Sequence, residues 1–168
     1  MKKLALTDFA KYRYPSALEL SPDSRYLTFA LKEVDREGDG YRWNLWLYDL
    51  ERRESRQITQ GDDQRKAVWE DNTHILYKTT EPDEALRARG FEEEWTVYHR
   101  LNVCTGEDRE AFRLPMSVSG LWKMDEGRYV FTGETHLDRP NLLELTGEAL
   151  EKELVRRQQT RGYKVLTE

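Results

Sequence analysis

The residues of this sequence whose types and spacing come nearest to a known site chemistry are acidic. Asp35-Arg36-Glu37-Gly38-Asp39-Gly40 has acidic side chains at alternate positions and a glycine at the sixth, as the start of an EF-hand calcium loop does. The twelfth position of such a loop needs a bidentate glutamate, but here it is Trp46, and strands rather than helices are predicted on both sides. We interpret the segment as a solvated acidic hairpin and expect no calcium binding.

Candidate nucleophiles and bases form no recognisable catalytic motif. Met116-Ser117-Val118-Ser119-Gly120 is the stretch nearest to the Gly-x-Ser-x-Gly elbow of α/β-hydrolases, but it lacks the first glycine and precedes a predicted strand. His74 and His99 lie inside predicted strands and His136 lies in a loop, without metal-ligand spacing, and Cys104 is the single cysteine. We predict structural roles for His74 and His99 and do not expect this chain alone to catalyse a reaction.

Two further clusters could suggest a phosphate-binding or an acid–base site, but we assign neither site. Gly38 and Gly40 are not followed by a helix that carries a third glycine, so no phosphate-binding loop is predicted. Paired carboxylates can act as general acid and base, but a run such as Glu92-Glu93-Glu94 is much more often solvated charge. No catalytic, cofactor-binding or metal-binding residue is therefore assigned, and no cofactor is expected.

Composition narrows the class of protein. The 168 residues carry a formal net charge of −5 with a pI near 5.4, and Lys and Arg are dispersed among Asp and Glu. Because nucleic-acid binding needs a basic stripe that releases counterions from phosphates, no nucleic-acid partner is expected. No apolar run approaches the roughly 18 residues of a membrane span, and Leu4-Ala5-Leu6 is too short for a signal peptide. The expectation is a cytoplasmic protein without a membrane segment.

The elements that would position any site are short strands arranged in repeats. Ser21-Pro22-Asp23-Ser24 predicts a turn, because Pro22 presets its own φ and Asp23 can accept a hydrogen bond from the backbone two residues on. An aspartate stands six residues before an aromatic side chain at three places, which are Asp23 and Phe29, Asp71 and Tyr77, and Asp125 and Phe131. An apolar residue stands three positions before each aspartate: Leu20, Val68 and Trp122. A repeat of about 50 residues built from short strands is typical of propeller blades.

The repeats predict a mainly all-β fold, an incomplete β-propeller of two four-stranded antiparallel blades and part of a third. The predicted divisions are a leading segment with a short helix (1–14), blade 1 (15–62), blade 2 (63–115), and a partial blade 3 (116–168) with a helical insertion near 147–158. The main predicted strands are 26–32, 43–50, 55–59, 67–69, 74–80, 95–103, 110–114, 118–122 and 128–132, with a helical turn over 84–89. On the insertion helix, Leu150 and Leu154 share one face, and Glu153 can pair with Arg157 at i,i+4.

Several of these stretches also resemble a known family. They are Leu6-Thr7-Asp8-Phe9-Ala10-Lys11-Tyr12-Arg13, the segment 20–29, Asn44-Leu45-Trp46-Leu47-Tyr48-Asp49-Leu50, and Gln57-Ile58-Thr59. Together they resemble the amino-terminal propeller of the prolyl oligopeptidase family of serine peptidases, in its acylaminoacyl-peptidase-like branch. Ser24 stands where the family usually has glycine, and the second and third turns lack Ser-Pro. In this family the propeller sits over a carboxy-terminal α/β-hydrolase domain and restricts which peptides reach a Ser-Asp-His triad, to which no residue here corresponds.

Two functions remain open at this stage. The first is a non-catalytic portion of a serine peptidase that gates or scaffolds the access of short or amino-terminally blocked peptides to a hydrolase domain absent from this chain. The second is a free-standing protein-interaction module, because the same repeat also occurs in propellers that are not enzymes. Blade faces without neighbours and unpaired strand edges further predict that the isolated chain forms a homodimer or swaps a strand with another copy.

Overall fold

Antiparallel strands make up most of the computed structural model, which describes residues 8, 11–35, 38–125, 127–135 and 138–160. Sheet 1 has the order β1 (Tyr14–Leu20), β2 (Tyr26–Asp35), β3 (Gly40–Asp49) and β4 (Glu54–Gln57). Sheet 2 has the order β5 (Ala67–Trp69), β6 (His74–Pro82), β7 (Glu94–Asn102) and β8 (Asp108–Leu114). Sheet 3 is the hairpin of β9 (Ser117–Asp125) and β10 (Arg128–Glu134). The predicted two four-stranded sheets and the partial third are confirmed.

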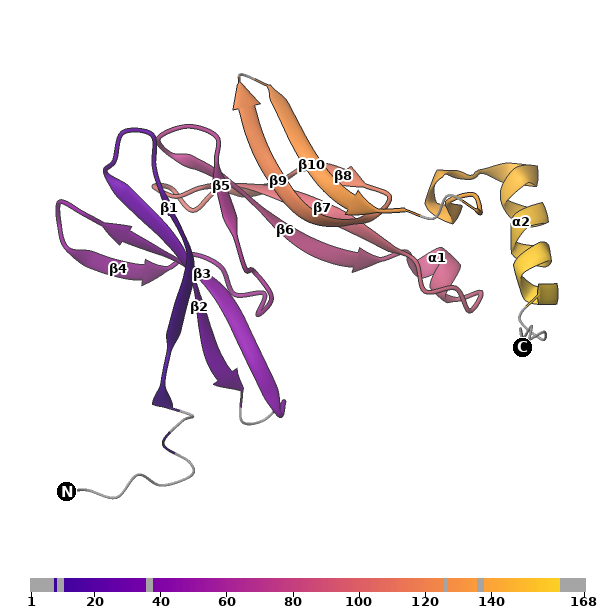
Figure 1. Cartoon of the computed structure of the whole chain (residues 1–168), viewed down its shortest axis with the longest axis horizontal. Helices are drawn as coiled ribbons and strands as arrows, with labels where there is room; N and C mark the ends of the chain where they lie inside the picture. The colour runs from indigo at the N-terminus through magenta and orange to yellow at the C-terminus, as the bar shows by residue number, and fades with distance from the viewer. Residues whose placement is uncertain (1–7, 9–10, 36–37, 126, 136–137, 161–168) are drawn as a thin grey trace, which may run out of the picture.

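The three sheets follow one another as propeller blades do (Figure 1). Within each four-stranded sheet, every strand pairs with the next strand along the chain. The first strands of the three sheets also lie side by side, since β5 contacts both β1 and β9. The core consists of the two layers between neighbouring sheets. One layer contains Ala30, Leu45, Leu47, Trp69, Ile75 and Leu101, and the other contains Leu76, Tyr98, Val118 and Leu121.

The aspartates of the first two repeats close their turns in the predicted way, whereas the Asp125 carboxylate of the third accepts hydrogen bonds from the Arg128 guanidinium. Asp23 accepts hydrogen bonds from the Arg25 amide at 3.1 Å and from the Ser21 hydroxyl at 2.6 Å. Asp71 accepts hydrogen bonds from the amides of Thr73 and His74, at 2.7 and 2.8 Å. These bonds occupy amide groups that the sheet ladder leaves unpaired at the turn, which explains why aspartate recurs there.

One predicted equivalence between the repeats is off by one residue. Val68 pairs with Leu76 and Trp122 pairs with Val130, so these two apolar residues occupy the same place in their sheets. Leu20 instead pairs with Leu27, as Trp69 pairs with Ile75. The turn after Leu20 is one residue longer than the turn after Trp69. It includes Ser24 at a φ of 59°, which puts this residue in the left-handed region that glycine adopts more easily.

The helices gather at one end of sheet 2 (Figure 1). Helix α1 (Glu84–Arg87) lies in the connection between β6 and β7, where a helical turn is predicted, and Asp83 caps it by accepting a bond from the Leu86 amide at 3.0 Å. After β10 come the 3₁₀ helix η2 (Leu142–Glu144) and helix α2 (Gly147–Thr160), two residues longer than predicted. We call residues 138–160 the insertion module.

The insertion module is fixed to α1 by a small apolar core of its own. Leu86 and Phe91 from the β6–β7 connection pack with Leu142 and Leu154 from the module, and Leu150 packs at the edge of this cluster. The predicted apolar face of the helix is therefore correct. This face packs on the β6–β7 connection of sheet 2. The predicted leading helix falls mainly on residues outside the described ones, and Tyr14 opens β1 instead of ending a helix. No helix in the described residues is long and apolar enough to cross a membrane.

Candidate functional site

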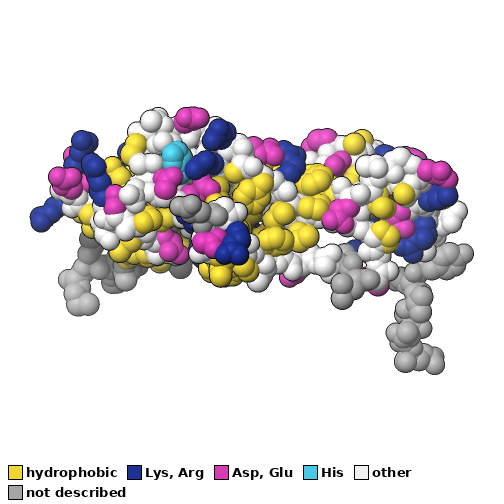
Figure 2. All heavy atoms as spheres, turned by 90° about the horizontal axis from the view of Figure 1, so that it is seen from above, with side chains coloured by type: hydrophobic (Ala, Val, Ile, Leu, Met, Phe, Trp, Pro, Cys, Tyr) yellow, Lys and Arg dark blue, Asp and Glu magenta, His cyan; other side chains and the backbone are white. Residues whose placement is uncertain are grey.

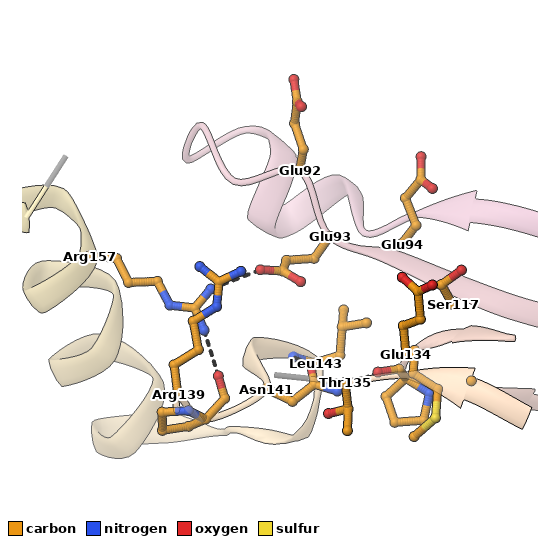
Figure 3. A pocket seen from close by; sticks show the side chains of 14 residues that line it. Glu92, Glu93, Glu94, Ser117, Glu134, Thr135, Arg139, Asn141, Leu143 and Arg157 are labelled. Atoms are coloured by element: carbon orange, nitrogen blue, oxygen red, sulfur yellow. Dashed lines mark hydrogen bonds and ion pairs between the residues drawn. The ribbon is translucent and has the colours of Figure 1, made fainter. Parts of the chain in front are cut away.

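A pocket of about 810 Å³ lies where the insertion module meets the strand ends of sheets 2 and 3 (Figure 3). Its wall comes from the start of β7, the β8–β9 connection, the end of β10 with the chain that follows it, and helix α2. We call it the junction pocket. Its lining residues are Glu92, Glu93, Glu94, Pro115, Met116, Ser117, Gly133, Glu134, Thr135, Arg139, Pro140, Asn141, Leu143 and Arg157.

Arg157 is the side chain that holds this wall together. Its guanidinium donates to Glu93 and to Glu153, each at 2.9 Å, and to the backbone oxygen of Pro140. Only the bond to Glu93 connects α2 to the start of β7, whereas the bonds to Glu153 and Pro140 lie within the insertion module and hold the planar guanidinium in place. Asn141 adds a second link by donating to the backbone oxygen of Pro115. The module thus bridges the ends of sheets 2 and 3.

The charge of the pocket depends on which carboxylates are already paired. Hydrogen bonds from Arg156 and Arg157 lower the pKa of Glu153 to about 2, so this carboxylate behind the wall stays ionised. Figure 3 shows Glu93 directed towards the arginines and Glu92 directed away from them. Glu134 and Arg139 are exposed and also line the pocket.

The arrangement is suited to binding a polar ligand that also carries apolar groups. Carboxylates and two guanidiniums line the same space as Met116 and Leu143, so the pocket offers both charge signs and apolar contacts. Ser117 is present, but no histidine or cysteine stands among the described residues that line the pocket.

The two described histidines lie in sheet 2 with hydrogen-bond partners. The Nδ1 atom of His74 lies 2.9 Å from a carboxylate oxygen of Asp71, and its Nε2 atom lies 3.2 Å from the Asn102 amide nitrogen. The His99 ring lies between Thr79, 3.1 Å from Nε2, and Asp108, 3.5 Å from Nδ1.

The surroundings of His99 point to a packing role. Its ring stacks on Tyr77 with centroids 5.2 Å apart, and the Tyr77 hydroxyl donates to Asp108. Burial raises the pKa of Tyr77 well above its ordinary value, which keeps this hydroxyl protonated as a donor. The hydroxyl, imidazole and carboxylate groups therefore lie beside the contact between sheets 1 and 2, outside the junction pocket.

The other sequence candidates lie apart from one another. The acidic stretch at 35–40 is the β2–β3 turn, in which Asp35 pairs with Gly40, and Arg36 and Glu37 lie outside the described residues, as His136 does. Residues 116–120 run into β9 and form no strand-to-helix elbow. In the part of the chain that the structure describes, no group of three or more His, Cys, Asp or Glu side chains is placed to hold a metal ion.

Sequence reasoning missed the junction pocket because its walls come from segments far apart in the chain. The prediction of solvated charge for Glu92-Glu93-Glu94 is wrong for Glu93, which is half-buried and bonded to Arg157. The i,i+4 pair of Glu153 and Arg157 is confirmed at 2.9 Å, but nothing in the sequence indicates that Arg157 also pairs with Glu93. One signal in the sequence could have indicated that the helix docks on another segment. Leu150 and Leu154 form an apolar helix face, and such a face needs an apolar surface to cover it.

The fold defines the described residues as part of a β-propeller. No model of a known protein family matches the sequence, and a search of curated proteins gives no significant match. Solved structures do match. The acylaminoacyl peptidase of Pyrococcus horikoshii superposes with a TM-score of 0.56 at 15% identity, over 74% of this chain and 18% of that one.

Two further solved structures carry the same arrangement of sheets. The propeller domain of the trilobed protease from Pyrococcus furiosus gives a TM-score of 0.53 at 13% identity, over 73% of this chain and 34% of that one. The isopeptidase AtxE2 gives 0.54 at 13% identity, over 90% of this chain and 24% of its own length. The described residues therefore share the propeller fold of part of these structures, and the chain spans between 18% and 34% of their lengths.

Proposed function

We propose that this chain is the amino-terminal propeller portion of a cytoplasmic serine peptidase. In this role it restricts the access of short or amino-terminally blocked peptides to a hydrolase domain carried elsewhere in the same polypeptide. The observation that carries the proposal is the fold match of the three consecutive sheets to an acylaminoacyl peptidase and to a protease propeller domain. Blades at 15–62, 63–115 and 116–168 are the proposed units of this portion.

The junction pocket supports a role in handling peptides. A peptide carries an ammonium group, a carboxylate and apolar side chains, and the pocket offers carboxylates, guanidiniums and apolar contacts in one space. None of the pocket residues is proposed to act on a peptide bond. Their proposed contribution is selection among the peptides that reach the hydrolase domain.

The test begins with the gene downstream of the codon for Glu168. We expect further repeats near 50 residues and a Gly-x-Ser-x-Gly motif in the same reading frame. The full-length protein should then react with a fluorophosphonate probe and hydrolyse acetylated dipeptide amides but not unfolded casein. Deleting residues 1–168 should raise casein cleavage relative to dipeptide cleavage, and an unchanged ratio would count against gating.

A free-standing interaction module is the alternative, and one observation favours it. Large apolar side chains on sheets 1 and 3 are exposed, among them Leu18, Leu20, Trp122 and Met124. A stop codon directly after Glu168, with no hydrolase domain encoded nearby, would support this alternative over the peptidase.

A further inference from the structure

A second cavity, of about 390 Å³, lies between sheets 1 and 2, at the end of β7 opposite the junction pocket. Its walls come from the β1–β2 turn, the β3–β4 hairpin and the β7–β8 turn. Strand β7 starts at the junction pocket, whereas Val103 and Cys104, which follow its last residue, line the second cavity. We call this cavity the arginine cavity, because Arg25, Arg52 and Arg56 all line it.

Two of these arginines are held in place by contacts that use few of their donors. The Arg25 guanidinium lies over the Tyr26 ring, 5.1 Å from its centroid, and Arg56 donates to the backbone oxygen of Val103. A guanidinium has five N–H donors in a planar fork, so one bond or one ring contact leaves most of its donors for a ligand.

The carboxylates near the cavity pair only loosely with the arginines. Asp49 accepts hydrogen bonds from the amides of Glu51 and Arg52, at 3.0 and 2.9 Å, and the bond from Arg52 is the main cause that lowers the pKa of Asp49. Its carboxylate lies 4.0 Å from the Arg52 guanidinium, and the Glu51 carboxylate lies 3.9 Å from that of Arg25. Both distances exceed the roughly 2.7–2.9 Å of a charge-assisted hydrogen bond, so a ligand can replace these contacts at little cost.

The cavity also offers uncharged donors and apolar contacts. Tyr26 and Ser55 line it, and burial raises the pKa of Tyr26, so the Tyr26 hydroxyl is a donor at neutral pH. Leu47 and Val103 line it as well, and both are buried. The volume of about 390 Å³ is near the lower end of the range of about 300–1,000 Å³ for small-molecule sites. The cavity is therefore suited to a small ligand.

The arginine cavity and the junction pocket differ in the sign of their charge. Among the described residues, Asp49 and Glu54 are the carboxylates that line the arginine cavity, so its three arginines leave one positive charge in excess. The junction pocket instead has four carboxylates and two arginines. In Figure 2, Lys and Arg side chains stand beside acidic ones at the left edge of the molecule, which is the side of the β3–β4 turn in Figure 1. A positive cavity in a chain of net charge −5 favours an anionic ligand.

We propose that the arginine cavity binds a phosphate group, either as free phosphate or as part of a small phosphate ester. Guanidiniums match phosphate oxygens with parallel N–H donors, and a phosphate has more charge and more acceptor oxygens than a carboxylate. Arg25 comes from the β1–β2 turn and Arg52 from the β3–β4 turn, so a phosphate in the cavity receives donors from both turns. In an ester, the organic part contacts Leu47 and Val103.

This inference goes beyond the proposed function and does not depend on it, because the cavity lies at the other end of β7 from the junction pocket. Isothermal titration of the full chain with phenyl phosphate, inorganic phosphate and benzoate is the test. We expect phenyl phosphate to bind at least about tenfold more tightly than benzoate, which carries one charge and two oxygens. Tighter binding of phenyl phosphate than of inorganic phosphate would indicate an ester, and equal binding would indicate free phosphate. No heat with either phosphate, or equal binding of benzoate, would overturn the proposal.

Single variants test whether the arginines hold the phosphate. Arg25→Gln and Arg52→Gln should each weaken phosphate binding about tenfold or more, and Arg52→Lys, which keeps the charge but not the planar fork, should recover part of the loss. Arg87→Gln is the matched control, because this side chain on α1 is 64% exposed, against 72% for Arg52, and lies at the other end of sheet 2. Circular dichroism checks folding, and the more exposed Arg52 carries the test if Arg25→Gln does not fold. Equal weakening by Arg87→Gln would show a general charge effect and contradict the proposal.

Alkylation of Cys104 shows whether the phosphate binds in this cavity. The Cys104 thiol is exposed and lines the cavity, and peptide mass spectrometry follows its modification. Iodoacetate is an anion and iodoacetamide is neutral, so the arginines should favour iodoacetate, and Arg25→Gln should lower the ratio of the two rates. Phenyl phosphate should slow both reactions. If phenyl phosphate binds in the titration but leaves both rates unchanged, it binds elsewhere and the proposal is wrong.

Discussion

Two ion pairs fasten helix α2 to the connection between β6 and β7, and they differ in exposure. Arg157 and Glu93 meet at 2.9 Å with side chains 12% and 28% exposed, whereas Arg89 and Glu151 meet at 2.6 Å with side chains 39% and 58% exposed. At an effective dielectric constant of about 20, the attraction at the first distance is about 6 kcal/mol, and the cost of removing both charges from water offsets most of it. We expect a net coupling of about 2 kcal/mol for Arg157 and Glu93.

A double-mutant cycle measures this coupling. The free energy of unfolding in urea is measured for the original protein, Arg157→Ala, Glu93→Ala and the double variant. The bond from Arg157 to Glu153 cancels from the coupling energy, because replacing Arg157 removes it whether or not Glu93 is present. The same cycle on Arg89 and Glu151 is the matched control, and its coupling should be several-fold smaller because water screens that pair. Couplings of equal size would refute the argument that burial decides how strongly each pair holds the insertion module.

Three further predictions concern the sheets. Ile75→Ala removes a fully buried side chain between sheets 1 and 2 and should lower the free energy of unfolding by about 2–4 kcal/mol in urea titrations. Burial raises the pKa of Asp71, but hydrogen bonds within its turn outweigh this and lower it to about 2. The turn should therefore lose about 1 kcal/mol, after allowance for solvent screening, as pH falls from about 5 to 2, and Asp71→Asn should flatten that part of the stability–pH curve. Gly106→Ala, at a φ of +80° with open space around it, should cost about 1 kcal/mol by thermal unfolding, whereas Gly40→Ala, not in the left-handed region, should cost much less.

The sheets could be predicted because their determinants are local. In sheets 1 and 2, an aspartate that accepts a hydrogen bond from the amide two residues after it fixes the turn within a few residues. The strand that follows each turn therefore begins where the spacing predicts, at Tyr26, His74 and Arg128. Register was less predictable, because one additional residue in the turn after Leu20 changes its partner without changing the pattern of residue types.

The junction pocket could not be predicted because its determinants are not local. Four strands, β7 to β10, separate Glu93 from helix α2 along the chain, and nothing in the spacing of residues in these segments indicates that Arg157 reaches Glu93. A pattern of i,i+4 charges looks the same on a solvated helix and on a docked one. Only the burial of Leu154 against Leu86 and Phe91 decides between the two, and that contact depends on where the β6–β7 connection lies.

Because the sheets and the junction pocket depend on different residues, the pocket can change while the sheets stay the same. The contacts between sheets use residues in the middle of strands, such as Leu45 and Ile75, while the pocket uses residues at strand ends and in the insertion module. The module has its own apolar core and its own ion pairs, so substitutions in the pocket need not disturb the sheet contacts. Changes at Arg139 or Glu134, which are exposed and have no role in either core, should therefore alter what the pocket binds at little cost in stability.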